Sequence, residues 1–261
     1  MPSTIRLSLL SLGLLLLLGC AALPPGQRSP RDPWERMNRA TYRFNDTFDK
    51  AIARPVARGY RRVTPHVVQT GVSNFLDNLE YPIVMVNDLL QGQFKPFLSD
   101  TGRLLLNTTV GIGGLMDPAT SAGLEKNDRD FGQTLGKWGA GTGPYLVIPF
   151  LGPSDVRDAV GRVGDEYCNP RHYIRNSWVK YGLAGLRAID TRARLLDAQS
   201  ALDSAYDPYA FLRNVYLQHR DFKVNGGQSA SEEEREQKML EEAGEEQPPE
   251  GSAPPPSPPP H

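Results

Sequence analysis

The chain has 261 residues, 39% of them hydrophobic and 23% charged, and a formal net charge of −1 at pH 7. This composition predicts a chain that is globular for most of its length, with one substantial core or two small ones. Beyond the first twenty residues no stretch approaches twenty consecutive apolar residues, so any membrane contact of the remaining chain would come from amphipathic or locally apolar helices.

The first twenty residues have the layout of a bacterial lipoprotein signal. Arg6 precedes the apolar run from Leu7 to Leu18, and Gly19 stands directly before Cys20. Residues 1–19 are therefore predicted to be a signal peptide, with Cys20 as the lipidated N-terminus of the mature chain. Several acyl chains, at about 0.8 kcal/mol for each buried methylene, would anchor it firmly. Ala21 in place of an aspartate favours the outer membrane; an ordinary secretory signal with a chance cysteine is the alternative.

Charge is distributed unevenly along the mature chain. The segment 228–261 is acidic and rich in proline, and it has too little apolar surface to offset the entropy of ordering, so it is predicted to be a disordered tail. Residues 20–227 carry a modest positive excess, which fits anionic lipid headgroups as well as it fits a solvated surface without a partner. Export argues against nucleic acid as a partner. Only Cys168 remains after lipidation of Cys20, so no internal disulfide is possible.

Helix signals recur after a linker over residues 20–31. Asp32-Pro33 is predicted to cap a first helix that Pro55 ends, Thr64-Pro65 to start a second, and Asp207-Pro208 to start the last. An apolar stripe from Ile174 to Leu196 predicts a long helix between them. Only residues 145–150 suggest a strand. The fold class is therefore mostly α, in a single domain.

The middle of the chain differs from these helices. Residues 111–143 are rich in glycine and follow an apolar cluster at Leu104, Leu105 and Leu106; the apolar run 145–151 comes next. Glycine permits unusual backbone dihedrals and proline breaks helices, so we expect a bent path here. Burial in a core is the default expectation for the apolar residues of this segment.

The sequence supplies no recognisable catalytic set. It contains no HExxH zinc motif, no GxSxG nucleophile elbow and no phosphate loop of the required spacing, so neither a metal nor a cofactor is expected. Cys168 is expected to be an inert thiol. Asp128, Asp130, Asp155 and Asp158 are expected to cap helices or pair with arginines instead of acting as acid and base.

Many short motifs between residues 30 and 227 occur in the order of a known family. They include Asp32-Pro33-Trp34-Glu35, Tyr42-Arg43-Phe44-Asn45, Ser73-Asn74-Phe75-Leu76-Asp77-Asn78-Leu79, Phe131-Gly132-Gln133-Thr134-Leu135-Gly136, Gly143-Pro144-Tyr145-Leu146-Val147-Ile148-Pro149 and Asp207-Pro208-Tyr209. With these motifs the chain resembles the MlaA family, also called VacJ-like lipoproteins. The resemblance implies that residues 32–227 form a helical ring in the inner leaflet of the outer membrane, with an amphipathic lipid channel through it.

The resemblance also implies a function. Such a ring would take phospholipids mislocalised to the outer leaflet and pass them to a soluble periplasmic carrier, while bound to a trimeric porin. Leu104, Leu105, Tyr145, Leu146 and Ile148 are expected to contribute to the apolar side of the lipid path. Two alternatives remain open: a structural porin-associated lipoprotein, and a membrane-anchored lipid hydrolase or acyltransferase.

One segment departs from the family pattern. In the family, the stretch before the long late helix forms a hairpin loop, often apolar, that is thought to control the channel. The corresponding residues 164–173 are polar here. The expectation is a gate of different character or a shifted loop.

Overall fold

The computed structural model describes residues 29–225, so the signal peptide, Cys20 and the tail 228–261 lie outside the described residues. The first half of the chain forms helices α2 (Glu35–Phe48), α3 (Arg54–Val63), α4 (His66–Leu90), α5 (Phe94–Thr109), α6 (Pro118–Ser121) and α7 (Phe131–Lys137). The second half forms strands β1 (Tyr145–Ile148) and β2 (Gly152–Asp155) and helices α8 (Val156–Cys168), α9 (Ser177–Arg194), α10 (Gln199–Asp203) and α11 (Pro208–Val224). The mostly helical class is confirmed.

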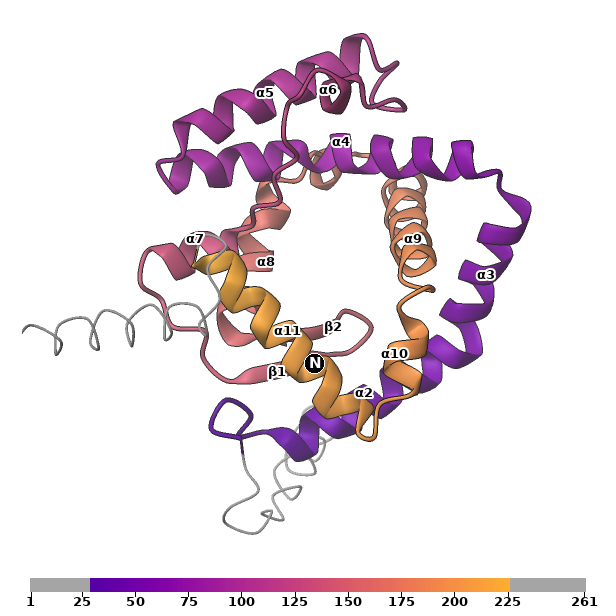
Figure 1. The fold of residues 1–261 in the computed structure, drawn as a ribbon, viewed down its shortest axis with the longest axis vertical. Coiled ribbons are helices and arrows are strands. Elements are labelled where there is room, and N and C mark those ends of the chain that lie inside the picture. Colours follow the sequence, from indigo (N-terminus) through magenta and orange to yellow (C-terminus); the bar gives the residue numbers. More distant parts are fainter. Residues whose placement is uncertain (1–28, 226–261) are drawn as a thin grey trace, which may run out of the picture.

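The helices are arranged around a central opening (Figure 1). Helices α2, α3 and α4 follow one another along one side of it, and α5 with α6 packs on the outer side of α4. Helices α7, α8 and α11 with the strand pair complete the circuit on the other side, while α9 lies inside the bend of α3 and α4. The two strands form an antiparallel hairpin in which Tyr145 pairs with Asp155 and Ile148 with Gly152.

The predicted helix starts are confirmed in part. Asp207 caps α11 by accepting a hydrogen bond from the backbone of Ala210, as the Asp-Pro motif predicts. The cap predicted at Asp32 is wrong, because α2 begins after Trp34 without a side-chain cap. Asp32 is instead fully buried and accepts hydrogen bonds from Asn38 and from another helix. A partner distant in sequence overrides the local capping signal.

The chain does not leave helical geometry at Pro55. A π-helical stretch over Asp49–Ala53 joins α2 directly to α3, and Pro55 lies in the first turn of α3. The Arg54 N–H bonds the Asp49 carbonyl five residues back, so the hydrogen-bond pattern shifts directly before the proline. The chain therefore bends while it remains helical, which lets α2, α3 and α4 follow the curve seen in Figure 1.

The glycine-rich middle follows a bent path with two short helices, α6 and α7. Gly114 has φ of +93° and its α-carbon lies so close to Asn78 of α4 that a β-carbon would come within 2.6 Å of that side chain. Helices α7 and α8 also cross closely, since a β-carbon on Gly161 would lie 2.4 Å from the backbone nitrogen of Gly132. Glycine is needed at both positions for packing.

Residues 164–173 do not form a hairpin loop. They complete α8 and then form a 3-10 turn over Pro170–Tyr173 before α9 begins. Among the described residues the hairpin lies earlier, at residues 145–155. The unbroken helical pattern of α8 up to Cys168 explains the difference.

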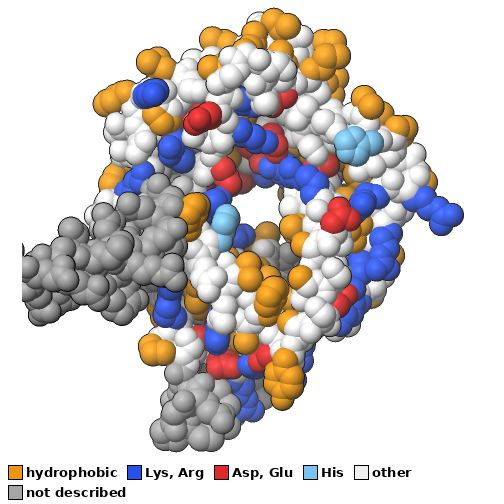
Figure 2. Space-filling model, in the orientation of Figure 1, with side chains coloured by type: hydrophobic (Ala, Val, Ile, Leu, Met, Phe, Trp, Pro, Cys, Tyr) orange, Lys and Arg blue, Asp and Glu red, His pale blue; other side chains and the backbone are white. Residues whose placement is uncertain are grey.

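Burial in this fold is inverted relative to an ordinary globular domain. Most buried residues of the described chain are polar or charged, whereas large apolar side chains such as Val63, Val67 and Trp178 are exposed by 79%, 81% and 90%. Figure 2 shows apolar side chains spread along the outer edge of the molecule. Within residues 29–225, no helix has the length and apolar character that crossing a membrane requires.

Candidate functional site: the central opening and its polar seams

The central opening persists when all atoms are drawn (Figure 2). Charged side chains of both signs gather on the part of its rim nearest α4, and apolar side chains on the part nearest the strand hairpin. The rim thus offers a polar side and an apolar side. A molecule with a charged head and apolar tails matches such a rim.

The seam between α4 and α9 is made by ion pairs. Arg187 of α9 donates to Asp77 at 2.5 Å and to Glu80 at 2.7 Å, and Lys126 also bonds Asp77. Burial by itself would raise the pKa of Asp77, but hydrogen bonds from Lys126 and Arg187 outweigh it and hold that pKa below its usual value. Asp77 is therefore ionised at neutral pH and ties three segments together.

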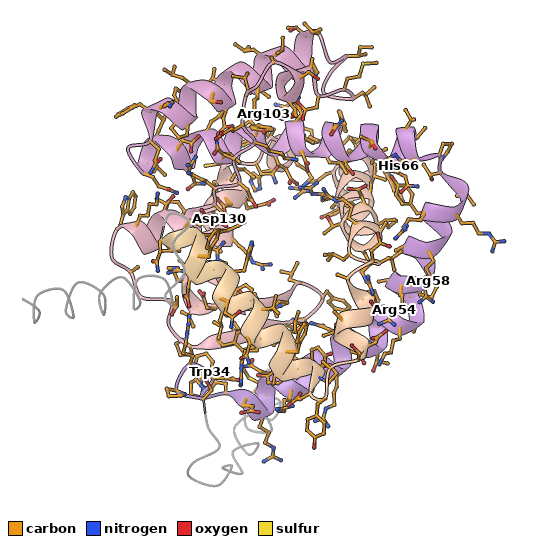
Figure 3. The ribbon with its side chains drawn as sticks, in the orientation of Figure 1. Trp34, Arg54, Arg58, His66, Arg103 and Asp130 are labelled. Carbon is orange, nitrogen blue, oxygen red and sulfur yellow. The ribbon has the colours of Figure 1, made fainter. Side chains whose placement is uncertain are left out.

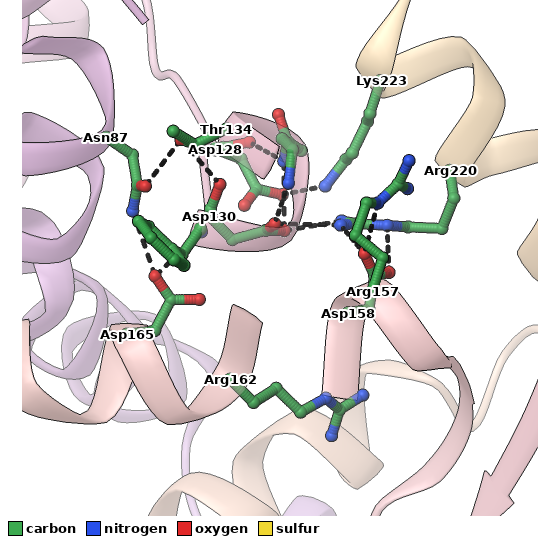
Figure 4. A network of polar contacts seen from close by, with 12 residues as sticks. Asn87, Asp128, Asp130, Thr134, Arg157, Asp158, Arg162, Asp165, Arg220 and Lys223 are labelled. Atoms are coloured by element: carbon green, nitrogen blue, oxygen red, sulfur yellow. Dashed lines mark hydrogen bonds and ion pairs between the residues drawn. The ribbon is translucent and has the colours of Figure 1, made fainter. Parts of the chain in front are cut away.

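A second cluster joins α7, α8 and α11 (Figure 4). Arg220 of α11 donates to Asp130 at 2.5 Å and to Asp158 of α8 at 2.6 Å, and the Tyr216 hydroxyl donates to Asp158 at 2.5 Å. Burial would raise the pKa of Asp130, but Arg220 outweighs burial and lowers it. Asp130 also accepts from the backbone of Gln133 and so caps α7, as expected from the sequence. One arginine thus closes the circuit between the last helix and the middle of the chain.

The same region holds a carboxyl group that forms no ion pair within residues 29–225. Asp165 accepts hydrogen bonds from the Phe131 backbone at 2.9 Å and from Asn87 of α4 at 3.0 Å. Burial raises its pKa to about 6, in spite of these donors. Thr134 donates to Asn87 at 2.7 Å, so a chain of hydrogen bonds from Thr134 through Asn87 to Asp165 links α4, α7 and α8 beside the Arg220 cluster.

The third seam joins the start of the described chain to α11. Asp32 accepts hydrogen bonds from Asn38 at 2.9 Å, Tyr209 at 2.5 Å and Arg213 at 3.0 Å. All of these groups are buried or nearly so. Burial and the hydrogen bond to Asp32 both raise the pKa of the Tyr209 phenol, so it stays a donor at every physiological pH.

Helices α4, α5 and α6 meet at Arg103, which Figure 3 places between α4 and α5. Its guanidinium is 1% exposed and donates to Tyr81 at 2.7 Å and to Asp117 at 2.7 Å. Each of these four junctions is therefore built on an arginine with carboxylate or phenol partners. Arg103 and Arg220 are buried, and Arg187 and Arg213 are half-buried. Buried charges are tolerated only when paired in this way.

The residues predicted for the lipid path lie in three environments. Leu104 of α5 is half-buried and Leu105 is 60% exposed. Tyr145 is fully buried in a small apolar cluster whose other members are Val147, Tyr209 and Leu217. Leu146 and Ile148 are half-buried on the opposite face of the hairpin. The structure therefore separates Tyr145, which packs in the core, from Leu146 and Ile148, for which a lipid-path role stays a prediction.

Among the described residues, no group of three or more His, Cys, Asp or Glu side chains could hold a metal ion. Cys168 is half-buried, and burial together with the nearby Asp165 raises the pKa of its thiol. A thiol of raised pKa is a poor nucleophile, in agreement with the sequence interpretation.

Sequence reasoning expected Asp130 and Asp158 to cap helices or pair with arginines, but it missed Arg220 as their partner and the seams that such pairs form between helices. The available signal was the number of aspartates inside predicted helices. Aspartate is a poor helix former, so its presence in the interior of a helix indicates a stabilising partner. Asp77, Asp88 and Asp190 all occupy such interior positions. Which arginine each one meets depends on how the helices meet in three dimensions.

Comparison with known proteins gives a consistent result. Residues 30–223 match the family model described as "MlaA lipoprotein". A protein of Escherichia coli named "Intermembrane phospholipid transport system lipoprotein MlaA" is 40% identical over 232 residues, which cover 86% of this chain and 90% of that protein. The protein of the same name in Haemophilus influenzae is 34% identical, covering 76% of this chain and 80% of its own. A solved structure described as "Structural basis for maintenance of bacterial outer membrane lipid asymmetry" has a TM-score of 0.67 and 38% identity, covering 76% of this chain and all of that one.

Proposed function

The chain belongs to the MlaA lipoprotein family, and we propose from this premise that it is an outer-membrane lipoprotein of intermembrane phospholipid transport that maintains lipid asymmetry. It is a transport protein and not an enzyme. In this function it removes mislocalised phospholipid from the outer leaflet, moves it through the central opening and passes it to a soluble periplasmic carrier. A trimeric porin holds the ring at the periplasmic side of the outer membrane.

The observation that carries the proposal is the amphipathic rim of the opening together with the inverted burial. A phospholipid needs a polar surface for its headgroup and an apolar one for its tails, and the rim has both. The apolar side chains on the outer edge suit a ring surrounded by acyl chains, while the buried ion pairs hold its helices together where the hydrophobic effect between helices is weak. Transport in this form breaks no covalent bond.

The two competing functions make different predictions. A structural porin-associated lipoprotein needs no lipid in the opening, and a lipid hydrolase would release fatty acid. Extracting the purified protein and identifying what comes with it separates the three. Intact phospholipid supports transport, hydrolysed lipid supports an enzyme, and the absence of lipid supports a structural role.

The strand hairpin supplies the sharper test, because its two faces differ. Leu146→Asp and Ile148→Asp place a charge on the half-buried face, and Val147→Asp is the matched control on the buried face. We expect Val147→Asp to destabilise the fold, since an unpaired buried charge costs several kcal/mol. Leu146→Asp and Ile148→Asp should leave protein abundance and porin co-purification normal while phospholipid accumulates in the outer leaflet. Normal clearance by stable variants would contradict a lipid path along this face.

A further inference from the structure

The last two turns of α3 carry a cluster of arginines that the seams of the ring do not use. Arg58, Arg61 and Arg62 line a recess of about 340 Å³ together with Leu196, which follows α9. Arg58 and Arg62 are four residues apart and so lie on the same face of the helix, with Arg61 beside them. Figure 3 places Arg58 on α3, across the opening from Asp130, and Figure 2 shows basic side chains gathered over this helix.

The cluster is poorly neutralised by its surroundings. Among the described residues, Arg58 and Arg62 form no ion pair, and Arg61 has one, at 2.8 Å to Asp197, whose side chain is 80% exposed. Arg54, one turn earlier, is buried and pairs with Asp49 and Asp203. The helix thus uses its first arginine for structure and leaves two others facing solvent without a partner in the described part of the chain.

One apolar side chain, Leu196, lines the same recess beside the arginines. Outside the lining of the recess, Leu195 is 55% exposed, and Val56 and Val63 of α3 are 44% and 79% exposed. A helix that exposes both arginines and aliphatic side chains is typical of a segment lying at a membrane interface. A small inorganic anion would need the arginines but would gain nothing from Leu196.

We propose that Arg58, Arg61 and Arg62 bind the phosphate of an anionic phospholipid headgroup, with the glycerol and the start of the acyl chains against Leu196. Arginine donates forked, charge-assisted hydrogen bonds that match phosphate oxygens. The site rests on the proposed function, because it requires the ring to lie among phospholipids. The site gives the protein a preference for anionic over zwitterionic lipid on the surface of α3, separate from the central opening.

The test titrates the full-length lipidated protein in neutral detergent with short-chain phosphatidylglycerol, short-chain phosphatidylethanolamine and inorganic phosphate. The wild-type protein should bind phosphatidylglycerol at least about tenfold more tightly than either other ligand, given the contribution of roughly 1 kcal/mol for each basic side chain near anionic lipid. Arg58→Gln/Arg62→Gln should lose that preference. Glutamine keeps helix propensity, and both positions are exposed, so the fold is expected to survive.

The matched control is Arg36→Gln/Arg43→Gln. These two arginines of α2 are also exposed and form no ion pair within residues 29–225, so the control removes the same net charge from another helix. The preference for phosphatidylglycerol should persist in it. An equal loss in both double variants, or no preference in the wild-type protein, would overturn the inference.

Two further arms identify other occupants. Inorganic phosphate bound as tightly as the lipid would mean that the recess binds free phosphate, which overturns the lipid assignment. The acidic segment 231–246 is tested as a peptide. If this peptide binds more tightly than phosphatidylglycerol, and if its binding requires Arg58 and Arg62, the lipid assignment is overturned as well.

Clearance of outer-leaflet lipid in cells is scored separately. Normal clearance without anionic preference removes this inference alone, whereas failed clearance by the wild-type chain removes the proposed function.

Discussion

At the level of single residues, the most unusual feature is a pair of aspartates buried against each other. Asp88 of α4 and Asp100 of α5 are both fully buried. Asp88 pairs with Arg129, and Asp100 accepts a hydrogen bond from Asn127 at 2.9 Å. One oxygen of each carboxyl has no other partner, as expected if the two groups share a proton. Burial and the hydrogen bond to Asp88 raise the pKa of Asp100 to about 7.

This pair gives the protein a defined pH dependence. The folded state keeps the shared proton up to about pH 7, whereas an aspartate in the unfolded chain loses its proton near the ordinary pKa of 3.8. The protonated pair therefore contributes its full stability below the pKa that Asp100 has in the unfolded chain. That contribution is lost as pH rises through the pKa of about 7 that Asp100 has in the folded protein. The slope is at most about 1.4 kcal/mol per pH unit between those values.

Asp100→Asn should remove that dependence. An amide can donate to Asp88 at every pH, so the melting temperature of the variant relative to wild type should rise as pH increases from about 4.5 to 7. Asp197→Asn is the control, because its side chain is exposed and should leave the curve unchanged. Parallel melting curves for wild type and Asp100→Asn across this range would show that the pair does not share a proton.

At the level of secondary structure, α2 holds the hairpin through two asparagines. Asn38 donates to the Tyr145 carbonyl and accepts from the Val147 amide, each at 2.9 Å. Asn45, two turns later, donates to the Ile148 carbonyl at 2.9 Å and accepts from the Phe150 amide at 2.8 Å. Each side-chain amide thus replaces one peptide of a neighbouring strand. This explains how a strand of four residues persists with only one strand partner.

Asn38→Ala should cost about 2–5 kcal/mol of unfolding free energy, because it leaves a buried amide and a buried carbonyl without partners. Asn45→Ala, whose partner Phe150 is 64% exposed, should cost about 1 kcal/mol because water replaces the lost bonds. Chemical denaturation in detergent measures both values. Equal losses of unfolding free energy in the two variants would show that burial of the hydrogen bonds at the strand edge does not determine how much they stabilise the protein.

The closure of the circuit by α11 gives a second prediction for the helices. The side chain of Arg220 is 8% exposed and pairs with Asp130 and Asp158, whereas Lys223 pairs with Asp128, which is 75% exposed. Arg220→Met should cost about 3–5 kcal/mol, since two carboxylates lose their cation in a buried site. Lys223→Met should cost no more than about 1 kcal/mol. Limited proteolysis should then cut near α11 first in the Arg220 variant alone.

The helices themselves were largely predictable from sequence, and their junctions were not. Apolar periodicity and Asp-Pro signals located α4, α9 and α11, and the alternation at residues 145–150 located β1. Periodicity could not show that Asp32 pairs with Tyr209 and Arg213, because those partners are about 180 positions away in the chain. For the same reason the sequence placed Tyr145 and Leu146 in one lipid path, whereas the strand pleat turns them to opposite faces.

At the level of the whole molecule, we expect the outer apolar edge and the lipid anchor to have separate tasks. The exposed apolar side chains suit the proposed place of the ring among acyl chains. Within residues 29–225 no helix is suited to span a membrane. We predict that stable attachment depends on acyl chains at Cys20, which lies outside the described residues and whose lipidation is a prediction from the signal sequence. The acidic tail is likewise outside them, and its disorder remains a prediction.

Cys20→Ser tests this separation of tasks. Without a lipidated cysteine the chain should be recovered unprocessed or in the soluble periplasmic fraction, because partial insertion of the outer edge binds less strongly than several buried acyl chains. Truncation after Gly227 is the control: it removes the tail but keeps Cys20 and the ring, so membrane recovery and detergent resistance of a complemented deletion strain should be unchanged. Fractionation with immunodetection measures both. Undiminished outer-membrane recovery of a correctly processed Cys20→Ser chain would mean that the apolar edge alone holds the ring in the leaflet.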